Sequence, residues 1–203
     1  MNKQAEPFMV EASPQVGRDR AHESAHLHVA GEATYIDDIR ELDGTLHAAL
    51  GLSPVAHGKL VSIDIERLRA EPGVTAVYTA ADIPGVNDVG PIVHGDDPIL
   101  ADGVVHYLGQ PMFAVIAADR RIARRVAARA KEFITIDPLP ALLTARDAHA
   151  AKAYVVPPMH LSRGDAQSAL KAAPHRFKDA LSIGGQEQFY LEGQISYAIP
   201  LED

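Results

Sequence analysis

The clearest hydrophobic pattern of the chain lies between residues 109 and 138. Residues 112–118 form an unbroken apolar run of strand length, which predicts a strand covered on both faces. Asp119 follows and can cap a helix, because its carboxylate can accept hydrogen bonds from the free amides of a first helical turn. Apolar residues then recur every four positions, as in an amphipathic helix, at Ile122, Val126 and Ala130. Residues 133–136 predict a second strand that ends at Pro138.

The order strand, helix, strand predicts a β-α-β unit whose strands are parallel neighbours joined by a right-handed crossover. A smaller unit of the same kind is predicted upstream. Its strands are expected at residues 59–65 and 74–79, with a helix over 65–70 that ends before Pro72, and a further strand at 45–52 precedes it. Together these patterns favour one α/β domain with a mixed sheet.

Residues 80–97 are dense in Gly, Pro, Asn and Asp and predict a long loop. Long irregular loops in compact domains are often binding loops. Ile92 and Val93 are apolar residues inside this loop. They either mark a surface that faces another molecule or fold back onto the core, and the sequence leaves both interpretations open.

The two ends of the chain have weaker patterns. Residues 1–21 lack the order of a secretion signal and are expected to form a flexible arm. Residues 141–165 predict a linker, followed by a short helix over 166–172. Two strands are predicted after it, at residues 176–188 and 194–200. Because two strands rarely stand alone in water, they are expected to belong to a second domain whose remainder lies outside this chain.

The amino-acid composition argues against several classes of function. The 203 residues are 47% hydrophobic and 23% charged, which is typical of a globular protein. The absence of cysteine excludes disulfides and thiolate metal sites and fits a cytoplasmic location. The net charge of −8 argues against nucleic-acid binding, and no apolar segment is long enough to cross a membrane. The basic side chains on the predicted central helix are expected to form a solvated face, at Arg120, Arg121, Arg124, Arg125 and Lys131.

Candidate chemistry is sparse. His22, His26 and His28 could contribute to a metal site, yet no carboxylate completes a ligand set, so surface or packing roles are favoured. A polar cluster at Gln186, Glu187, Gln188 and Glu192 surrounds Phe189 and Tyr190. It could present amides and carboxylates to a ligand, or it could fix a domain junction through hydrogen bonds, which is the favoured interpretation.

Four segments in order resemble the molybdenum-binding subunit of xanthine dehydrogenase. They read HVAGEATYIDDI, SIDIERLRAEPGVTAVYTAADIPG, VHYLGQPMFAVIAAD and SIGGQEQFYLEGQ. The resemblance implies an α+β chain. An α/β hammerhead domain with a mixed sheet and β-α-β units would span residues 22–140, and the first strands of a molybdopterin-binding domain would span 166–203. A stand-alone, non-catalytic hammerhead interaction module is the alternative.

The resemblance also implies a reaction, the hydroxylation of hypoxanthine and xanthine to urate at a molybdenum-molybdopterin cofactor. Electrons would pass through [2Fe-2S] clusters and FAD, on other domains or on a partner subunit, to NAD. The rest of the molybdenum-binding subunit, the iron-sulfur/FAD subunit and a purine would be the partners. The resemblance leaves one other enzyme as an alternative, a related hydroxylase that acts on aldehydes or N-heterocycles.

Few roles carry over to individual residues. The resemblance places Gly90, Pro91 and Ile92 at the mouth of a substrate funnel. It also suggests structural support for the cofactor domain from Gln110, Gln186, Glu187, Phe189, Tyr190 and Glu192. The family's glutamine beside the metal, its glycine-rich segment and its catalytic glutamate are expected beyond Asp203. The resemblance therefore assigns no catalytic residue and no metal ligand to this chain.

Overall fold

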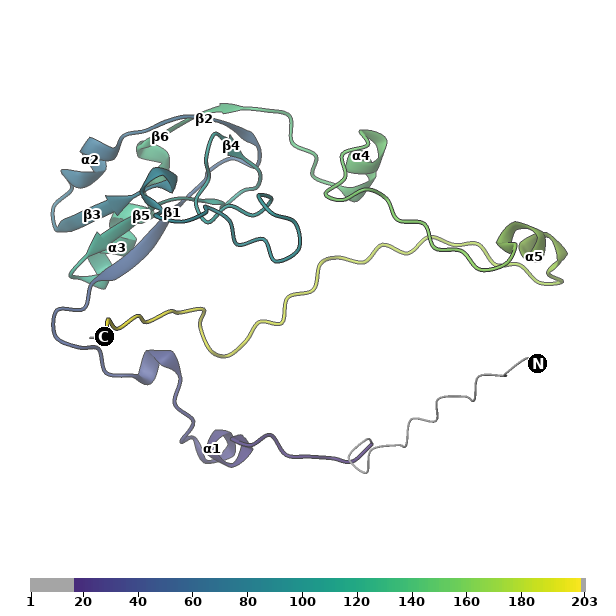
Figure 1. The fold of residues 1–203 in the computed structure, drawn as a ribbon, viewed down its shortest axis with the longest axis horizontal. Coiled ribbons are helices and arrows are strands. Elements are labelled where there is room, and N and C mark those ends of the chain that lie inside the picture. Colours follow the sequence, from purple (N-terminus) through teal and green to yellow (C-terminus); the bar gives the residue numbers. More distant parts are fainter. Residues whose placement is uncertain (1–16, 202–203) are drawn as a thin grey trace, which may run out of the picture. The chain divides into compact units, whose positions relative to one another are not determined.

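A computed structural model describes residues 17–201 of the chain (Figure 1). Its contacts divide the chain into two units. The larger runs from Leu42 to Leu181, and the smaller combines the segment up to Glu41 with the segment from Ser182 onward. Most of the predicted arm, residues 1–16, lies outside the described residues.

The larger unit contains six strands and four α-helices. The strands are β1 (His47–Leu52), β2 (Gly58–Ile63), β3 (Val74–Tyr78), β4 (Val104–Val105), β5 (Pro111–Ala117) and β6 (Ile134–Pro138). The helices are α2 (Ile65–Arg69), α3 (Arg120–Ala127), α4 (Ala145–Ala150) and α5 (Ala166–Ala172), with short 3-10 turns at Ala80–Asp82 and Ala130–Glu132. In the smaller unit the described elements are α1 (Ala25–Ala30) and a 3-10 turn at Ile36–Asp38.

The strands form two antiparallel sheets of three strands each, in the orders β1-β5-β3 and β4-β2-β6. The predicted α+β class is confirmed, but the prediction of parallel β-α-β units in a mixed sheet was wrong. β5 and β6 lie in different sheets, and so do β2 and β3 (Figure 1). The order of the elements from β1 to β3 and from β5 to β6 was predicted correctly, but local patterns do not determine which strands pair. That is decided by which apolar faces meet across the core.

β5 lies at the centre of its sheet and of the core. The side chains of Phe113, Val115 and Ala117 are fully buried on one face of the strand. They belong to one cluster with residues of the helices, chiefly Leu68 of α2 and Val126 of α3. The helices therefore cover this face of β5, as the continuous apolar run predicted.

The helix cap predicted at Asp119 is confirmed, and two further aspartates cap helices. The Asp119 carboxylate accepts a hydrogen bond from the backbone N–H of Arg121 at 2.7 Å, at the start of α3. The Asp64 carboxylate accepts one from the N–H of Arg67 at 3.1 Å, at the start of α2. In the same way Asp165 caps α5, which has the predicted bounds 166–172.

The carboxyl-terminal segment differs from the prediction. Among the described residues after α5, which extend to 201, none forms a strand, so the two strands predicted at 176–188 and 194–200 were wrong. Phe177 is 98% exposed and Phe189 is 92% exposed, so no second strand or sheet covers this segment. Strand-like sequences adopt a sheet only where a partner satisfies their backbone hydrogen bonds. The segment predicted as a linker, residues 141–165, contains α4, which the sequence did not indicate.

No helix among residues 17–201 is both long and apolar enough to span a membrane.

Candidate functional site

The loop from residues 83 to 103 is organised around the carboxylate of Asp88. This carboxylate accepts hydrogen bonds from the backbone N–H groups of Gly95 at 2.7 Å, Gly90 at 3.1 Å and Asp97 at 3.3 Å. These amides hold the pKa of the Asp88 carboxyl below its usual range, because they stabilise the ionised form. The Asp88 side chain therefore connects residue 90 with residues 95 and 97 on the returning part of the loop.

Two further features fix this loop. The Asn87 side chain donates to the carbonyl of Leu100 at 2.7 Å and accepts from the N–H of Leu100 at 3.0 Å. At Gly90 a side chain would overlap the carbonyl of Val93 and the side chain of Asp96, so only glycine fits. The loop has no helix or strand, but its hydrogen bonds give it a definite shape.

The structure answers the question left open for Ile92 and Val93. The Ile92 side chain is 88% exposed and that of Val93 is 36% exposed, so neither is buried in the core. Gly90, Pro91 and Ile92 lie together on one short stretch of the loop, beside the Asp88 network. A funnel role for these residues remains a prediction that the structure does not test.

We expect this loop to loosen in acid. Asp88 has a lowered pKa in the folded chain, so its stabilising effect is fully present above the unfolded value of about 3.9. This stabilising effect is lost as the pH falls through the pKa that Asp88 has in the folded chain. An NMR titration should therefore show the amide signals of Gly90 and Gly95 shifting with a midpoint below that of a free aspartate.

Asp88→Asn should abolish this acid transition, whereas Asp96→Asn in the same loop should leave it in place, because no hydrogen bond in the network uses the Asp96 carboxylate. A midpoint at or above the value of a free aspartate would contradict the proposed role of Asp88.

Gln110 is fully buried at the turn that leads into β5. Its side-chain oxygen accepts from the N–H of His106 at 2.7 Å, and its backbone carbonyl accepts from the N–H of Ser53 at 2.9 Å. The side-chain nitrogen Nε2 has no partner among the described residues. Gln110 thus fixes the turn, while support of a cofactor domain remains a prediction.

The segment from Gln186 to Glu192 is mostly exposed. The Glu192 carboxylate accepts a hydrogen bond from the N–H of Ile36 at 3.0 Å, which links the two segments of the smaller unit. Tyr190 and Glu192 line a hollow of about 380 Å³ together with Tyr35. Glu192 therefore joins two chain segments within the smaller unit, while the domain junction expected for this cluster remains a prediction.

The hollow is not lined by Gln186, Glu187 or Phe189. Glu187 accepts only from the neighbouring N–H of Gln188, at 3.1 Å, among the hydrogen bonds of the described chain. Phe189 has a positive φ of 51°. This conformation is uncommon for a bulky residue, and nothing in the described residues explains it.

The histidines near α1 contact one another and a tyrosine. The ring centroids of His22 and His28 are 6.2 Å apart, and Tyr35 lies 6.0 Å from His28. Residues 17–201 contain no group of three or more histidines or carboxylates placed to bind a metal ion. The described residues thus do not supply a ligand set for a metal cofactor.

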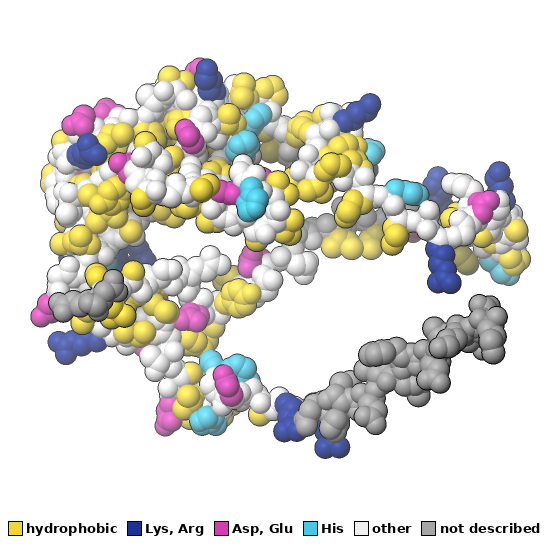
Figure 2. Space-filling model, viewed as in Figure 1, with side chains coloured by type: hydrophobic (Ala, Val, Ile, Leu, Met, Phe, Trp, Pro, Cys, Tyr) yellow, Lys and Arg dark blue, Asp and Glu magenta, His cyan; other side chains and the backbone are white. Residues whose placement is uncertain are grey.

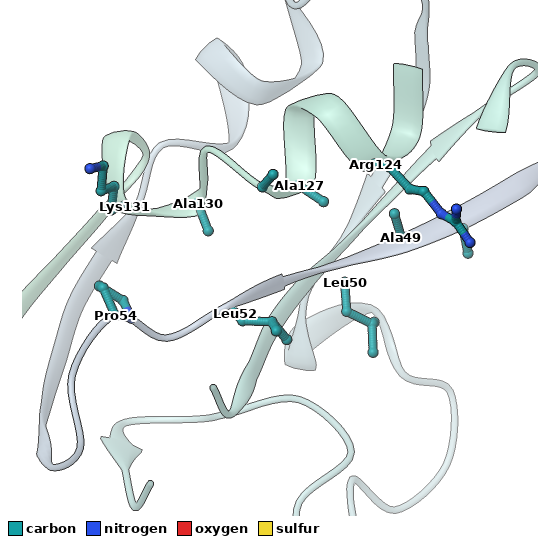
Figure 3. Close-up of a pocket in the computed structure, with 10 residues that line it drawn as sticks. Ala49, Leu50, Leu52, Pro54, Arg124, Ala127, Ala130 and Lys131 are labelled. Carbon is teal, nitrogen blue, oxygen red and sulfur yellow. The ribbon is translucent and has the colours of Figure 1, made fainter. Parts of the chain in front are cut away.

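The structure adds a groove that the sequence did not indicate. It has a volume of about 610 Å³ and lies between β1 and α3 with the 3-10 turn that follows (Figure 3). Its walls include Ala48, Leu50 and Leu52 of β1, and Arg124, Ala127 and Lys131 on the opposite side. Figure 2 shows other hydrophobic side chains on the surface of the larger unit, interspersed with charged ones.

This groove was missed because its two walls are far apart in the sequence. The only local signal is the absence of charge in β1, whose sequence is HAALGL. The basic residues of α3 were interpreted as a solvated face, and Arg124 is indeed exposed.

Residues 30–134 match the family model described as aldehyde oxidase and xanthine dehydrogenase, a/b hammerhead domain. This is just over half of the chain. The chain belongs to this family. Its hammerhead match includes β1 to β5 and α3, and it falls within the predicted bounds 22–140.

The hammerhead chain is similar to several longer proteins. It is 36% identical over 197 residues to a xanthine dehydrogenase of Oryza sativa, a match that covers 96% of this chain and 14% of that protein. It is 35% identical over 186 residues to aldehyde oxidase 2 of Cavia porcellus, which covers 91% of this chain and 13% of that protein. The chain thus spans about one seventh of the length of these relatives.

A solved structure supports the same relationship. The aldehyde oxidoreductase of Desulfovibrio gigas aligns with a TM-score of 0.55 and 30% sequence identity. The alignment covers 65% of the hammerhead chain and 15% of that structure's chain. These matches confirm the family that the sequence motifs indicated.

Proposed function

We propose that this chain is the amino-terminal part of the molybdenum-binding subunit of a xanthine dehydrogenase. The complete enzyme would hydroxylate hypoxanthine and xanthine to urate in the cytoplasm. The observation that carries this proposal is 36% identity to a xanthine dehydrogenase along nearly the whole chain. Because that relative is about seven times longer, the proposal assigns the chemical step to polypeptide outside these 203 residues.

The cofactors and partners follow from the same proposal. A molybdenum-molybdopterin cofactor would supply the hydroxylation chemistry, and [2Fe-2S] clusters and FAD would carry electrons to NAD. The described residues offer no metal ligand set, so no step of the reaction is assigned to them. Their proposed role is to frame the site.

Within that frame, the loop held by Asp88 would border the path of the substrate. Its exposed apolar tip at Ile92 and the rigid network behind it suit a wall that contacts a flat heterocycle. Gln110 would contribute by fixing the turn before β5. Gln186, Glu187, Phe189, Tyr190 and Glu192 would lie near the start of the cofactor domain.

The proposal is tested on the protein at its natural locus. An affinity tag at the amino terminus allows the native protein, with any further polypeptide and partners, to be purified and assayed. We expect xanthine-dependent reduction of NAD, urate as the product and bound molybdenum. The isolated 203-residue chain should show none of these. Activity of the isolated chain, or a native protein without molybdenum, would contradict the proposal.

A second candidate is a related hydroxylase that acts on aldehydes or N-heterocycles. It is favoured by the 35% identity to an aldehyde oxidase, which nearly equals the identity to the xanthine dehydrogenase. The same purified protein should be assayed with xanthine, benzaldehyde and quinoline. Turnover of benzaldehyde or quinoline in place of xanthine would select this second candidate.

A further inference from the structure

We propose that the groove beside β1 binds an extended, acidic segment of another polypeptide, which adds a strand to the β1-β5-β3 sheet. Within residues 17–201, β1 pairs only with β5 and is an edge strand of this sheet. No residue of β5 lines the groove, so it lies along the free side of β1. The proposal uses the part of this edge that lines the groove, residues 48–52, because an edge of this kind can pair its backbone groups with an incoming strand.

β1 lacks the features by which proteins usually protect edge strands. Its six residues, HAALGL, include no Lys, Asp, Glu or Pro. Two other edge strands of the unit are protected, because β4 has only two residues and β6 ends in Asp137 and Pro138. Leu50 and Leu52 of β1 are 50% and 46% exposed, as in a strand from which an apolar neighbour is missing.

The opposite wall leaves room for a backbone. It consists largely of alanines, at Ala127, Ala128 and Ala130, whose short side chains allow close approach. In Figure 3, Leu50 and Leu52 lie on the side of β1 away from α3, whereas Ala127 and Ala130 lie on the α3 side. A strand placed in the groove would alternate its side chains between these two sides.

The charged side chains that line the groove indicate which kind of strand would bind there. Arg124 and Lys131 line the α3 side of the groove, and neither side chain forms a hydrogen bond or an ion pair within residues 17–201. A guest strand with carboxylates on that side and apolar residues on the other would match both walls. A second copy of β1 does not match, because it carries no carboxylate and would bring a second Arg124 and Lys131 close to the first pair.

The test uses the isotope-labelled 203-residue chain and a nine-residue peptide that alternates valine and glutamate, with blocked ends. Hydrogen exchange measured by NMR should show new protection at every second amide of β1, because alternate amides of an edge strand point away from its partner. The matched peptide of valine and lysine should bind at least tenfold more weakly.

Charge reversal provides the decisive comparison. The double variant Arg124→Glu, Lys131→Glu should bind the glutamate peptide at least tenfold more weakly and should now bind the lysine peptide. Arg125→Glu is the matched control, because Arg125 is on the same helix but does not line the groove. If the double variant does not fold, a salt titration of the original chain serves instead, since the affinity should fall as salt increases.

Other results would overturn the proposal. Unchanged exchange of the β1 amides at saturating peptide would exclude strand addition. Equal binding of the two peptides would exclude an acidic guest. A dimer of the chain that protects β1 without peptide would show that the second copy is the occupant. The inference does not depend on the proposed reaction, so a negative activity assay would leave this binding test unaffected.

Discussion

Replacing Phe113 with alanine should lower the free energy of unfolding of the chain by about 3 to 5 kcal/mol. The Phe113 ring is fully buried on β5, within the cluster that joins both helices to the central strand. Truncation removes the transfer free energy of the ring and leaves a cavity that rigid neighbours fill only in part. Urea unfolding followed by circular dichroism measures the change.

The matched control is Phe177→Ala. It makes the same chemical change at a side chain that is 98% exposed, so the free energy of unfolding should stay within about 0.5 kcal/mol of the original. Similar losses for the two variants would mean that Phe113 does not occupy the core as described.

The second large effect is expected at Gly51, which pairs with Phe113 across β1 and β5. A Cβ atom at this position would overlap the Phe113 ring. Gly51→Ala should therefore lower the free energy of unfolding by about 1 to 3 kcal/mol, because the ring must shift within a packed core. The same urea experiment measures it.

Two comparisons isolate the steric cause. Gly85→Ala places the same methyl group where no atom lies within 4 Å, and it should have little effect. In a chain that already carries Phe113→Ala, the cost of Gly51→Ala should largely vanish, because the overlapping ring is gone. An undiminished cost in the double variant would show that the backbone at Gly51, and not the contact with Phe113, is responsible.

This contact shows why sequence patterns could not give the whole fold. The strand at β5, the Asp119 cap, the helix after it and the long loop were all predicted from local order of apolar and polar residues. Such patterns depend on neighbours within a few positions of the chain. Gly51 lies 62 positions before Phe113, and nothing near either residue indicates that they meet.

The candidate sites also depend on contacts between residues that are distant in the sequence. The motifs indicated the family, but they did not show that Glu192 accepts a hydrogen bond from Ile36, which lies 156 positions away. The Asp88 network was not predicted, because a loop with many Gly and Asp residues does not show which carboxylate collects its amides. The groove beside β1 required two distant walls to be brought together.

The sequence by itself determined α2, α3 and α5, most of the strands of the larger unit and the family, because these depend on local periodicity, caps and ordered motifs. Only the tertiary structure decided that the strands form two antiparallel sheets, that β1 is left at an edge and that residues 173–201 contain no strand. Strand pairing is decided by contacts between distant segments, since each strand's backbone groups need a partner that the local sequence does not contain.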